Sequence, residues 1–266
     1  KFSRPNFLFN CILIFSCFNL IAQDRITGNL FASRSETIAK NGMVATSHPL
    51  ASQVGVEILK SGGNAIDAAI ASNAALGLME PTGNGIGGDL FALVWIEKDK
   101  KLYGLNASGR SPKNLTFNYL KENEFKKIPS YGALSISVPG CVDGWFELHE
   151  KFGKIKMEKI LNPAIEYAKN GFPVTELVAY YINLSSRFYS SYPNFKETYL
   201  INGKSPKKGE IFKNPYLAKT LSIISKKGRK GFYEGEIAEK ISDFIISQGG
   251  FVSYDDLKNH KSEWIE

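Results

Sequence analysis

The sequence predicts an α+β fold in which helices alternate with short strands, and three observations support this class. A strongly apolar segment over residues 65–79 follows Asn64 and predicts a helix that is buried on most sides. Two short apolar runs, residues 90–96 and 102–105, flank the polar turn 97–101 and predict a β-hairpin. Further segments with apolar residues at helical spacing follow the hairpin.

The elements before the hairpin are predicted mainly from the residues at their ends. Residues 42–46 read as a strand, and residues 49–59 predict a helix that starts at a proline and stops at two glycines. Asn64 is a good N-cap for the next helix, and Asp67 three positions later predicts a capping box. Pro81 follows the end of that helix.

Beyond the hairpin the sequence is mainly helical. Helices are predicted over residues 142–152, 157–169, 216–225 and 234–248. Residues 183–215 are rich in Ser, Asn, Pro, Lys and Tyr and predict surface loops and short turns. There is no internal repeat and no linker long enough to separate two domains, so residues 24–266 are interpreted as one domain.

Composition is that of an ordinary globular protein. The chain has 266 residues, of which 43% are hydrophobic and 22% charged, so disorder is not expected. Its formal charge of +7 comes from short, scattered basic clusters with no accompanying nucleic-acid motif. We therefore predict a solvated basic surface and no nucleic-acid partner.

The first 23 residues differ from the rest and predict a signal peptide. Lys1 and Arg4 precede an apolar run over residues 7–22 that is interrupted by Asn and Ser, and cleavage is expected near Ala22. An uncleaved membrane anchor, or a lipoprotein signal at Cys17, is the competing interpretation. The signal peptide predicts a secreted or periplasmic protein without stable membrane insertion.

A glycine-rich stretch, residues 80–91, contains the pattern G-x-G-x-x-G at Gly83, Gly85 and Gly88. A dinucleotide site needs a strand before these glycines and a helix after them, whereas here a helix precedes and a strand follows. We therefore expect no nucleotide. The glycines are interpreted as a loop that needs several positive φ angles or a close backbone approach.

Few residues have the types and spacing of a catalytic or metal site. Removal of the signal peptide leaves Cys141 alone, which excludes an internal disulfide and a cysteine metal site. Cys141 with His149 as base is a possible nucleophilic pair, but a small buried hydrophobic role is the more common one. The three histidines are too dispersed to predict a metal, and the Thr46-Ser47-His48 motif is interpreted as a strand end before a helix cap.

Several motifs in sequence order resemble the N-terminal part of the γ-glutamyltranspeptidase family. The resemblance begins near residue 36 and runs to the end of the chain, over residues 42–51, 62–69, 80–89, 138–140, 163–165, 171–174, 232–235, 249–250 and 255–257.

This resemblance implies a four-layer αββα sandwich of the N-terminal nucleophile hydrolase type, incomplete in this chain, which would be part of a large subunit. It implies a precursor that cleaves itself, and a threonine on a small subunit that attacks a γ-glutamyl amide such as glutathione. The glutamyl group would pass to water or an amino acid. We accordingly expect the nucleophile to lie beyond Glu266, no catalytic residue in this chain, no activity of this piece alone, and no cofactor.

One substrate contact follows from the resemblance. Family members hold the α-carboxylate of the donor with an arginine shortly after the first hairpin, and Arg110 occupies that place within residues 106–112. A planar guanidinium can bind a carboxylate through two parallel hydrogen bonds. The alternative is that Arg110 makes only a surface ion pair.

Two other functions stay open. The Gly-Arg-Ser-Pro sequence at residues 109–112 departs from the Arg-Glu-Thr-Ala-Pro type of the family and looks more like a cephalosporin-acylase-like branch, whose donor would be a glutaryl amide. A noncatalytic secreted binding protein on the same scaffold is the second alternative.

Overall fold

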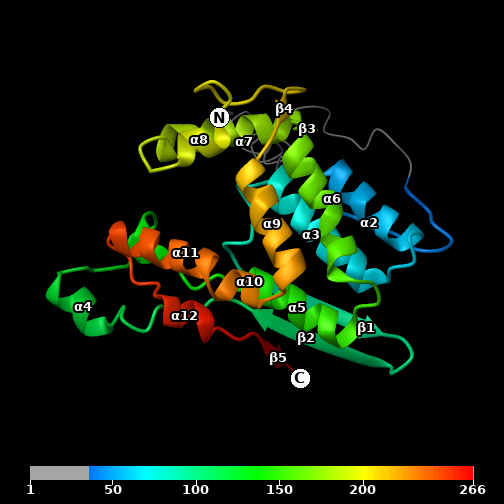
Figure 1. Cartoon of the computed structure of the whole chain (residues 1–266), viewed down its shortest axis with the longest axis horizontal. Coiled ribbons are helices and arrows are strands. Elements are labelled where there is room, and N and C mark those ends of the chain that lie inside the picture. The colour runs from blue at the N-terminus through cyan, green and yellow to red at the C-terminus, as the bar shows by residue number, and fades with distance from the viewer. Residues whose placement is uncertain (1–35, 266) are drawn as a thin grey trace, which may run out of the picture. The chain divides into compact units, whose positions relative to one another are not determined.

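The computed structural model describes residues 36–265, and residues from Asn41 onward group into one compact unit (Figure 1). The signal peptide predicted over residues 1–23 lies outside the described residues. Within the described range, no helix is both long and apolar enough to cross a membrane.

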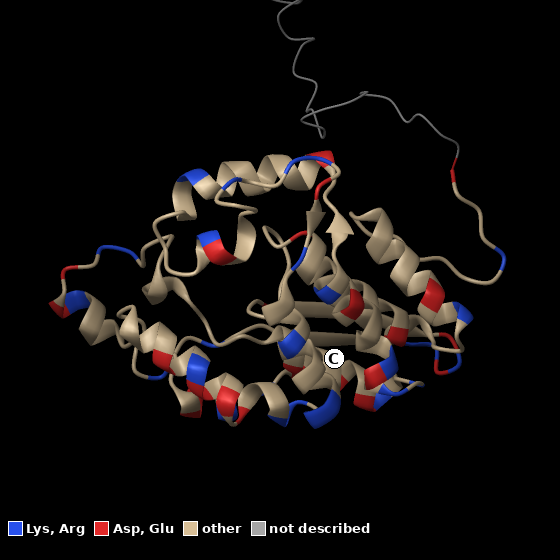
Figure 2. Ribbon diagram, turned by 45° about the horizontal axis from the view of Figure 1, so that its top comes forward, with Lys and Arg blue, Asp and Glu red and all other residues tan. Residues whose placement is uncertain are grey.

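Helices dominate this unit, and Lys and Arg are interspersed with Asp and Glu along them (Figure 2). The helices are α2 (Pro49–Lys60), α3 (Ala65–Met79), α4 (Phe117–Glu122), the 3-10 helix η1 (Ala133–Ser135), α5 (Cys141–Phe152), α6 (Met157–Asn170), α7 (Glu176–Tyr189), α8 (Phe195–Tyr199), α9 (Pro215–Lys227), α10 (Lys230–Tyr233), α11 (Glu236–Ser247) and α12 (Tyr254–Lys258). The strands are β1 (Leu90–Ile96), β2 (Lys101–Ala107), β3 (Phe172–Pro173), β4 (Ile211–Phe212) and β5 (Glu263–Ile265).

Helix α3 packs against α2, α5 and α6. The predicted capping box is confirmed: the Asn64 side chain accepts from the backbone N–H of Asp67 at 3.0 Å, and the Asp67 side chain accepts from that of Asn64 at 2.9 Å. Buried alanines such as Ala71 and Ala75 allow neighbouring helices to approach closely.

The predicted hairpin is also confirmed. Strands β1 and β2 pair antiparallel from Leu90 opposite Ala107 to Ile96 opposite Lys101, and β5 pairs antiparallel with the other edge of β2. Helix α5 packs on one face of these strands (Figure 1). Its Trp145 is buried and donates to the side-chain oxygen of Asn73 on α3 at 2.8 Å. A second, two-stranded sheet joins β3 to β4.

The opposite face of the β1-β2-β5 sheet is apolar and exposed. Side chains alternate between the two faces of a strand, so Phe91, Leu93 and Trp95 of β1 share one face. Their exposed fractions are 69%, 79% and 54%. Residues that pair directly across neighbouring strands lie on the same face of a sheet. Leu102 pairs with Trp95 and therefore belongs to this face. Ile265 pairs with Gly104, which pairs with Leu93, so Ile265 belongs to it as well. We call these five residues the open face. The described residues thus contain one helix layer and a sheet that is covered on one side only.

Three predictions need correction. Residues 42–46 form no strand, because they have no hydrogen-bonded strand partner among the described residues. Residues 183–215 are not all loop: α7 extends into them from a Thr175 cap, and α8 and β4 follow. In the glycine-rich stretch 80–91, called the glycine loop below, only one of the four glycines, Gly85, has a positive φ. A need for several positive φ angles therefore does not explain why this loop is rich in glycine.

Candidate functional site

Arg110 follows the end of β2, and two close backbone approaches fix the chain there. A Cβ atom at Gly109 would overlap the carbonyl oxygen of Val138, and one at Gly140 would overlap that of Ala107. The N–H of Val138 also donates to the Arg110 carbonyl at 3.0 Å. The segment that carries Arg110 is therefore held tightly against the residues that lead into α5.

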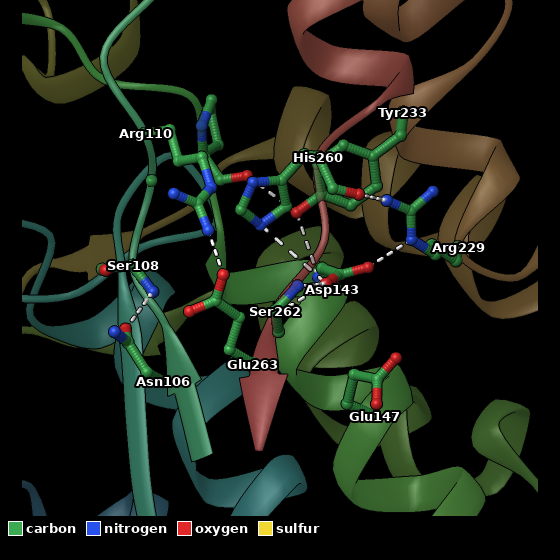
Figure 3. Close-up of polar contacts among 12 residues, drawn as sticks. Asn106, Ser108, Arg110, Asp143, Glu147, Arg229, Tyr233, His260, Ser262 and Glu263 are labelled. Carbon is green, nitrogen blue, oxygen red and sulfur yellow. Dashed lines mark hydrogen bonds and ion pairs between the residues drawn. The ribbon is translucent and has the colours of Figure 1, made fainter. Parts of the chain in front are cut away.

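The Arg110 guanidinium pairs with Glu263 on β5, 153 residues later (Figure 3). Their side chains are 71% and 59% exposed, so solvent screens this pair and its own contribution to stability is small. Glu263 pairs in register with Asn106, and Asn106 pairs with Phe91. Glu263 therefore lies on the same side of the sheet as the open face.

A buried carboxylate anchors the start of β5. Asp143, in the first turn of α5, is 2% exposed and pairs with the Nε of Arg229. Its Oδ2 atom accepts from the N–H of Ser262 at 2.7 Å and from the Ser262 hydroxyl at 2.5 Å. Arg229 also donates to the carbonyl of His260. Asp143, Arg229, His260 and Ser262 thus form an anchor that fixes Glu263 (Figure 3).

Two rings complete the surroundings of this anchor. The Tyr233 hydroxyl donates to the Pro139 carbonyl at 2.8 Å and accepts from the N–H of Asp143 at 3.0 Å. The Arg229 guanidinium lies 4.4 Å from the centre of the Tyr233 ring, which itself stacks on His260. Burial raises the pKa of Tyr233, so its hydroxyl remains protonated.

His260 is the least satisfied polar group of the anchor. Its Nε2 atom is 3.8 Å from Asp143 Oδ2, beyond hydrogen-bond range, and has no hydrogen-bond partner within residues 36–265. Burial lowers the pKa of His260, and the nearby Asp143 only partly opposes this effect. His260 is therefore neutral at pH 7, and Arg229 is the charge that balances Asp143.

A cavity of about 570 Å³ adjoins Arg110. Its lining combines cationic, acidic and neutral polar groups, including Lys113, Asp255 and His260. Such a lining suits a small polar ligand. Within residues 36–265 no group of three or more His, Cys, Asp or Glu could hold a metal ion.

Cys141 and His149 do not form a catalytic pair. The Cys141 thiol lies 3.5 Å from the side-chain oxygen of Asn73, while the His149 ring is bonded to the carbonyl of Ile155 at 2.7 Å. Burial raises the pKa of Cys141 to about 12, so the thiolate needed for attack is almost absent at pH 7. The buried structural role of this cysteine is confirmed.

Of the role expected for Thr46-Ser47-His48, the helix cap is confirmed, whereas no strand precedes it in the described part of the chain. The Thr46 hydroxyl donates to the His48 carbonyl at 2.7 Å and contacts the Ser52 hydroxyl at 2.8 Å. His48 is the N-cap of α2 and accepts from the N–H of Leu50. Both side chains serve the start of the helix.

The glycine loop contacts the start of α5. The carbonyl of Gly88 accepts from the N–H groups of Gly140 and Cys141, both at 2.9 Å. These donors at the helix N-terminus are therefore used within the protein. The helix-loop-strand order predicted for this stretch is confirmed.

Sequence reasoning selected Arg110 as a candidate and did not predict its contact with Glu263 or the anchor. Asp143 interrupts the apolar residues at the start of the predicted helix 142–152, which is the signal of a buried acid. Its partner Arg229 stands in a basic cluster that was interpreted as solvated surface. No local pattern connects Glu263 with Arg110.

Comparisons with known proteins agree with one another. The γ-glutamyltranspeptidase family model matches residues 51–266. The glutathione hydrolase-like YwrD proenzyme of Bacillus subtilis is 39% identical over 228 residues, which are 85% of this chain and 43% of that protein. The chain spans less than half the length of the curated relatives it matches.

Solved structures show the same relationship. A cephalosporin acylase from Bacillus halodurans matches with a TM-score of 0.85 at 41% identity, over 91% of this chain and 46% of that one. A γ-glutamyltranspeptidase from Helicobacter pylori matches with a TM-score of 0.83 at 31% identity, over 87% and 67%. The N-terminal nucleophile hydrolase fold is therefore confirmed, and the chain belongs to the γ-glutamyltranspeptidase family.

Proposed function

We propose that the protein containing this chain transfers or hydrolyses the γ-glutamyl group of amides such as glutathione, and that Arg110 binds the α-carboxylate of the donor. The observation that carries this proposal is the position of Arg110. Arg110 follows the end of β2 and its side chain is exposed. Its guanidinium contacts Glu263, which lies on the same side of the sheet as the open face. A ligand held there would lie between this chain and whatever covers the open face.

The open face supports a second subunit from the same precursor. Large contiguous apolar surfaces are uncommon on monomers and mark interaction sites. A second sheet packed on Phe91, Leu93 and Trp95 would bury them about 10 Å from its own backbone and complete a four-layer αββα sandwich. The word proenzyme in the name of the Bacillus subtilis relative fits a protein matured by cleavage.

In the proposed reaction, a threonine at the start of that small subunit attacks the γ-carbonyl carbon of the donor. Its hydroxyl proton passes to its own α-amine and then to the departing amine, as the C–N bond breaks and an ester forms. Water or the amine of an amino acid then attacks the ester and restores the hydroxyl. Arg110 fixes the other end of the glutamyl group, which places the carbonyl at the nucleophile. No step needs a cofactor.

A cephalosporin-acylase-like amidohydrolase is the second candidate. The 41% identity to the Bacillus halodurans enzyme favours it. Such an enzyme would use the same scaffold and Arg110, with a glutaryl donor that has a carboxylate and no α-amine.

We place the mature protein in the secreted or periplasmic space, through cleavage of the signal peptide over residues 1–23. The basic start and interrupted apolar run of that segment support this localisation.

Purification of the full-length protein tests the function. Mass spectrometry should find two fragments separated immediately before a threonine, and the protein should release a chromogenic amine from a γ-glutamyl anilide. Replacement of that threonine by alanine is the control and should abolish both cleavage and turnover. A wild-type protein that remains one chain and turns over neither γ-glutamyl nor glutaryl anilide would refute the proposal.

A further inference from the structure

We propose that two copies of the protein associate through helix α7, which packs antiparallel against α7 of the second copy around a two-fold axis. This inference is independent of the proposed function. It concerns a surface that the strand pairing, the anchor and Arg110 do not use.

Helix α7 turns an apolar stripe toward solvent. Four of its large side chains are 36% to 61% exposed: Leu177, Tyr181, Leu184 and Phe188. They follow one another at steps of four, three and four residues, which is the a/d spacing of a coiled coil and places them on one face of the helix. A different side of α7 buries Val178 and Ile182 in the protein. We call the four exposed residues the α7 stripe.

The rest of the described fold leaves the α7 stripe uncovered. Among the elements of residues 36–265, only α8 makes more than isolated contacts with α7. In Figure 1, α9 lies between α7 at the top and the β1-β2-β5 sheet at the bottom. A subunit that covers the open face therefore need not reach α7. An apolar surface of this kind marks a separate site of interaction.

The α7 stripe is complementary to itself in an antiparallel pair. Leu177 and Phe188 are equally far from the midpoint of the stripe, as are Tyr181 and Leu184. A two-fold axis at that midpoint brings each residue opposite the counterpart of its pair from the second copy. Every layer of the interface then combines one aromatic ring with one leucine, which keeps the side-chain volume even along the contact.

The charges beside the stripe fit the same arrangement. Glu176 and Arg187 are eleven residues apart, which is about three helical turns, so they lie on one flank of α7. Glu176 pairs with Lys208 at 2.8 Å, whereas Arg187 has no ion-pair partner among residues 36–265. The two-fold axis brings Arg187 to within about 3 Å, along the helix axis, of the level of Glu176 in the second copy. Each interface would gain this ion pair twice, while a parallel pair would put the two flanks on opposite sides.

Apolar surface continues beyond the C-terminal end of α7. Exposed Tyr131, Tyr192 and Phe244 line a cavity of about 410 Å³ there. Specific interfaces bury at least about 1,000 Å² in total and are enriched in tyrosine and phenylalanine. In the antiparallel pair, this surface lies beside the N-terminal end of the partner's α7, so it extends the contact at both ends.

Analytical ultracentrifugation of the full-length protein over a concentration series tests the association. We expect a reversible dimer whose dissociation constant rises at least about 10-fold in Leu184→Glu, because this change places an unpaired charge in the centre of the interface. The matched control is Phe117→Glu on α4, which puts the same charge on another exposed apolar residue and should leave the dissociation constant unchanged.

Charge exchange tests the antiparallel orientation. Glu176→Arg and Arg187→Glu should each weaken the dimer by about 5-fold or more, because each creates like charges on both sides of the two-fold axis. The double variant Glu176→Arg/Arg187→Glu restores opposite charges and should recover most of the affinity. No recovery in the double variant would refute this orientation.

A cysteine in the stripe identifies what covers it. A short bismaleimide should link Leu184→Cys into a covalent dimer, and the unsubstituted protein, in which Cys141 is buried, is the control. A single-copy mass at every concentration overturns the inference, as does a dimer that Leu184→Glu leaves intact. Failure of maleimide to label Leu184→Cys would mean that the rest of the protein covers the stripe. Labelling without dimer formation, together with binding to phosphatidylglycerol vesicles that Leu184→Glu abolishes, would mean that the stripe contacts a membrane instead.

Discussion

Replacement of Asp143 by alanine should destabilise the protein strongly. Asp143 is 2% exposed, and its carboxylate neutralises Arg229, which is 27% exposed. The change leaves this cation without its partner and leaves the N–H and hydroxyl of Ser262 without their acceptor. Loss of one member of a buried ion pair costs about 3 to 5 kcal/mol. Because water reaches part of Arg229, we expect the lower end, about 3 kcal/mol.

Thermal unfolding of the full-length protein measures this effect. A change of 1 kcal/mol shifts the midpoint by about 2 to 4 °C for domains of about 150 to 250 residues and by less for larger proteins, so Asp143→Ala should lower Tm of the full-length protein by about 6 °C or less. The control is Asp243→Ala on the exposed side of α11, which should change stability by less than about 0.5 kcal/mol.

A double-mutant cycle separates the ion pair from general damage. If Asp143 stabilises mainly by neutralising Arg229, the double variant Asp143→Ala/Arg229→Ala should be less destabilised than the sum of the single variants. A Tm for Asp143→Ala equal to that of Asp243→Ala, or strictly additive single effects, would refute the anchor as we describe it.

Three further predictions follow from the same contacts. Cys141→Ala should leave kcat unchanged. Iodoacetamide should modify Cys141 of the native protein at pH 8 about a thousandfold more slowly than an exposed thiol, because a pKa of about 12 leaves very little thiolate. Rapid labelling of Cys141, or loss of activity in the alanine variant, would contradict this. Gly109→Ala should lower the free energy of unfolding by about 1 to 3 kcal/mol and raise the KM for the donor, because the alanine Cβ would overlap backbone atoms of Val138. An unchanged Tm would contradict this prediction. Burial lowers the pKa of both His48 and His260, so the unfolded state binds more protons once the pH falls below about 6.5. Stability should therefore be constant with respect to these groups above pH 7 and fall from pH 6.5 downward, and the His48→Gln/His260→Gln variant should show a flatter dependence in denaturant titrations.

The sequence allowed prediction of elements with local signals. Helix α3 was predictable because Asn64, Asp67 and Pro81 mark its ends and its apolar residues leave no polar face. Strands β1 and β2 are adjacent, so one turn predicts their pairing. By contrast, β5 has three residues and exists through its pairing with β2, far away in the sequence. Residues 42–46 have strand composition without a partner in the described part of the chain.

The candidate site was predictable only in part, for the same reason. Arg110 was selected as a candidate through the motif order of the family. Glu263 lies 153 residues from Arg110, and Asp143 lies 86 residues from Arg229, so folding brings them together and no spacing reveals it. Helix α7 was missed because its second half, residues 183–189, falls in the Ser- and Asn-containing stretch that was assigned to loops, and because the helix buries only Val178 and Ile182 among its side chains.

The most direct test of the central claim is the donor kinetics of the Arg110→Ala variant of the full-length protein. Truncation of one member of a desolvated charge pair costs about 2 to 5 kcal/mol, so kcat/KM for γ-glutamyl anilide should fall by about 30-fold or more, chiefly through a higher KM. Far-UV circular dichroism and Tm should stay close to wild type, because the Arg110 side chain is exposed in this chain. An unchanged KM in a folded variant would contradict the assignment of Arg110 as the residue that binds the donor carboxylate.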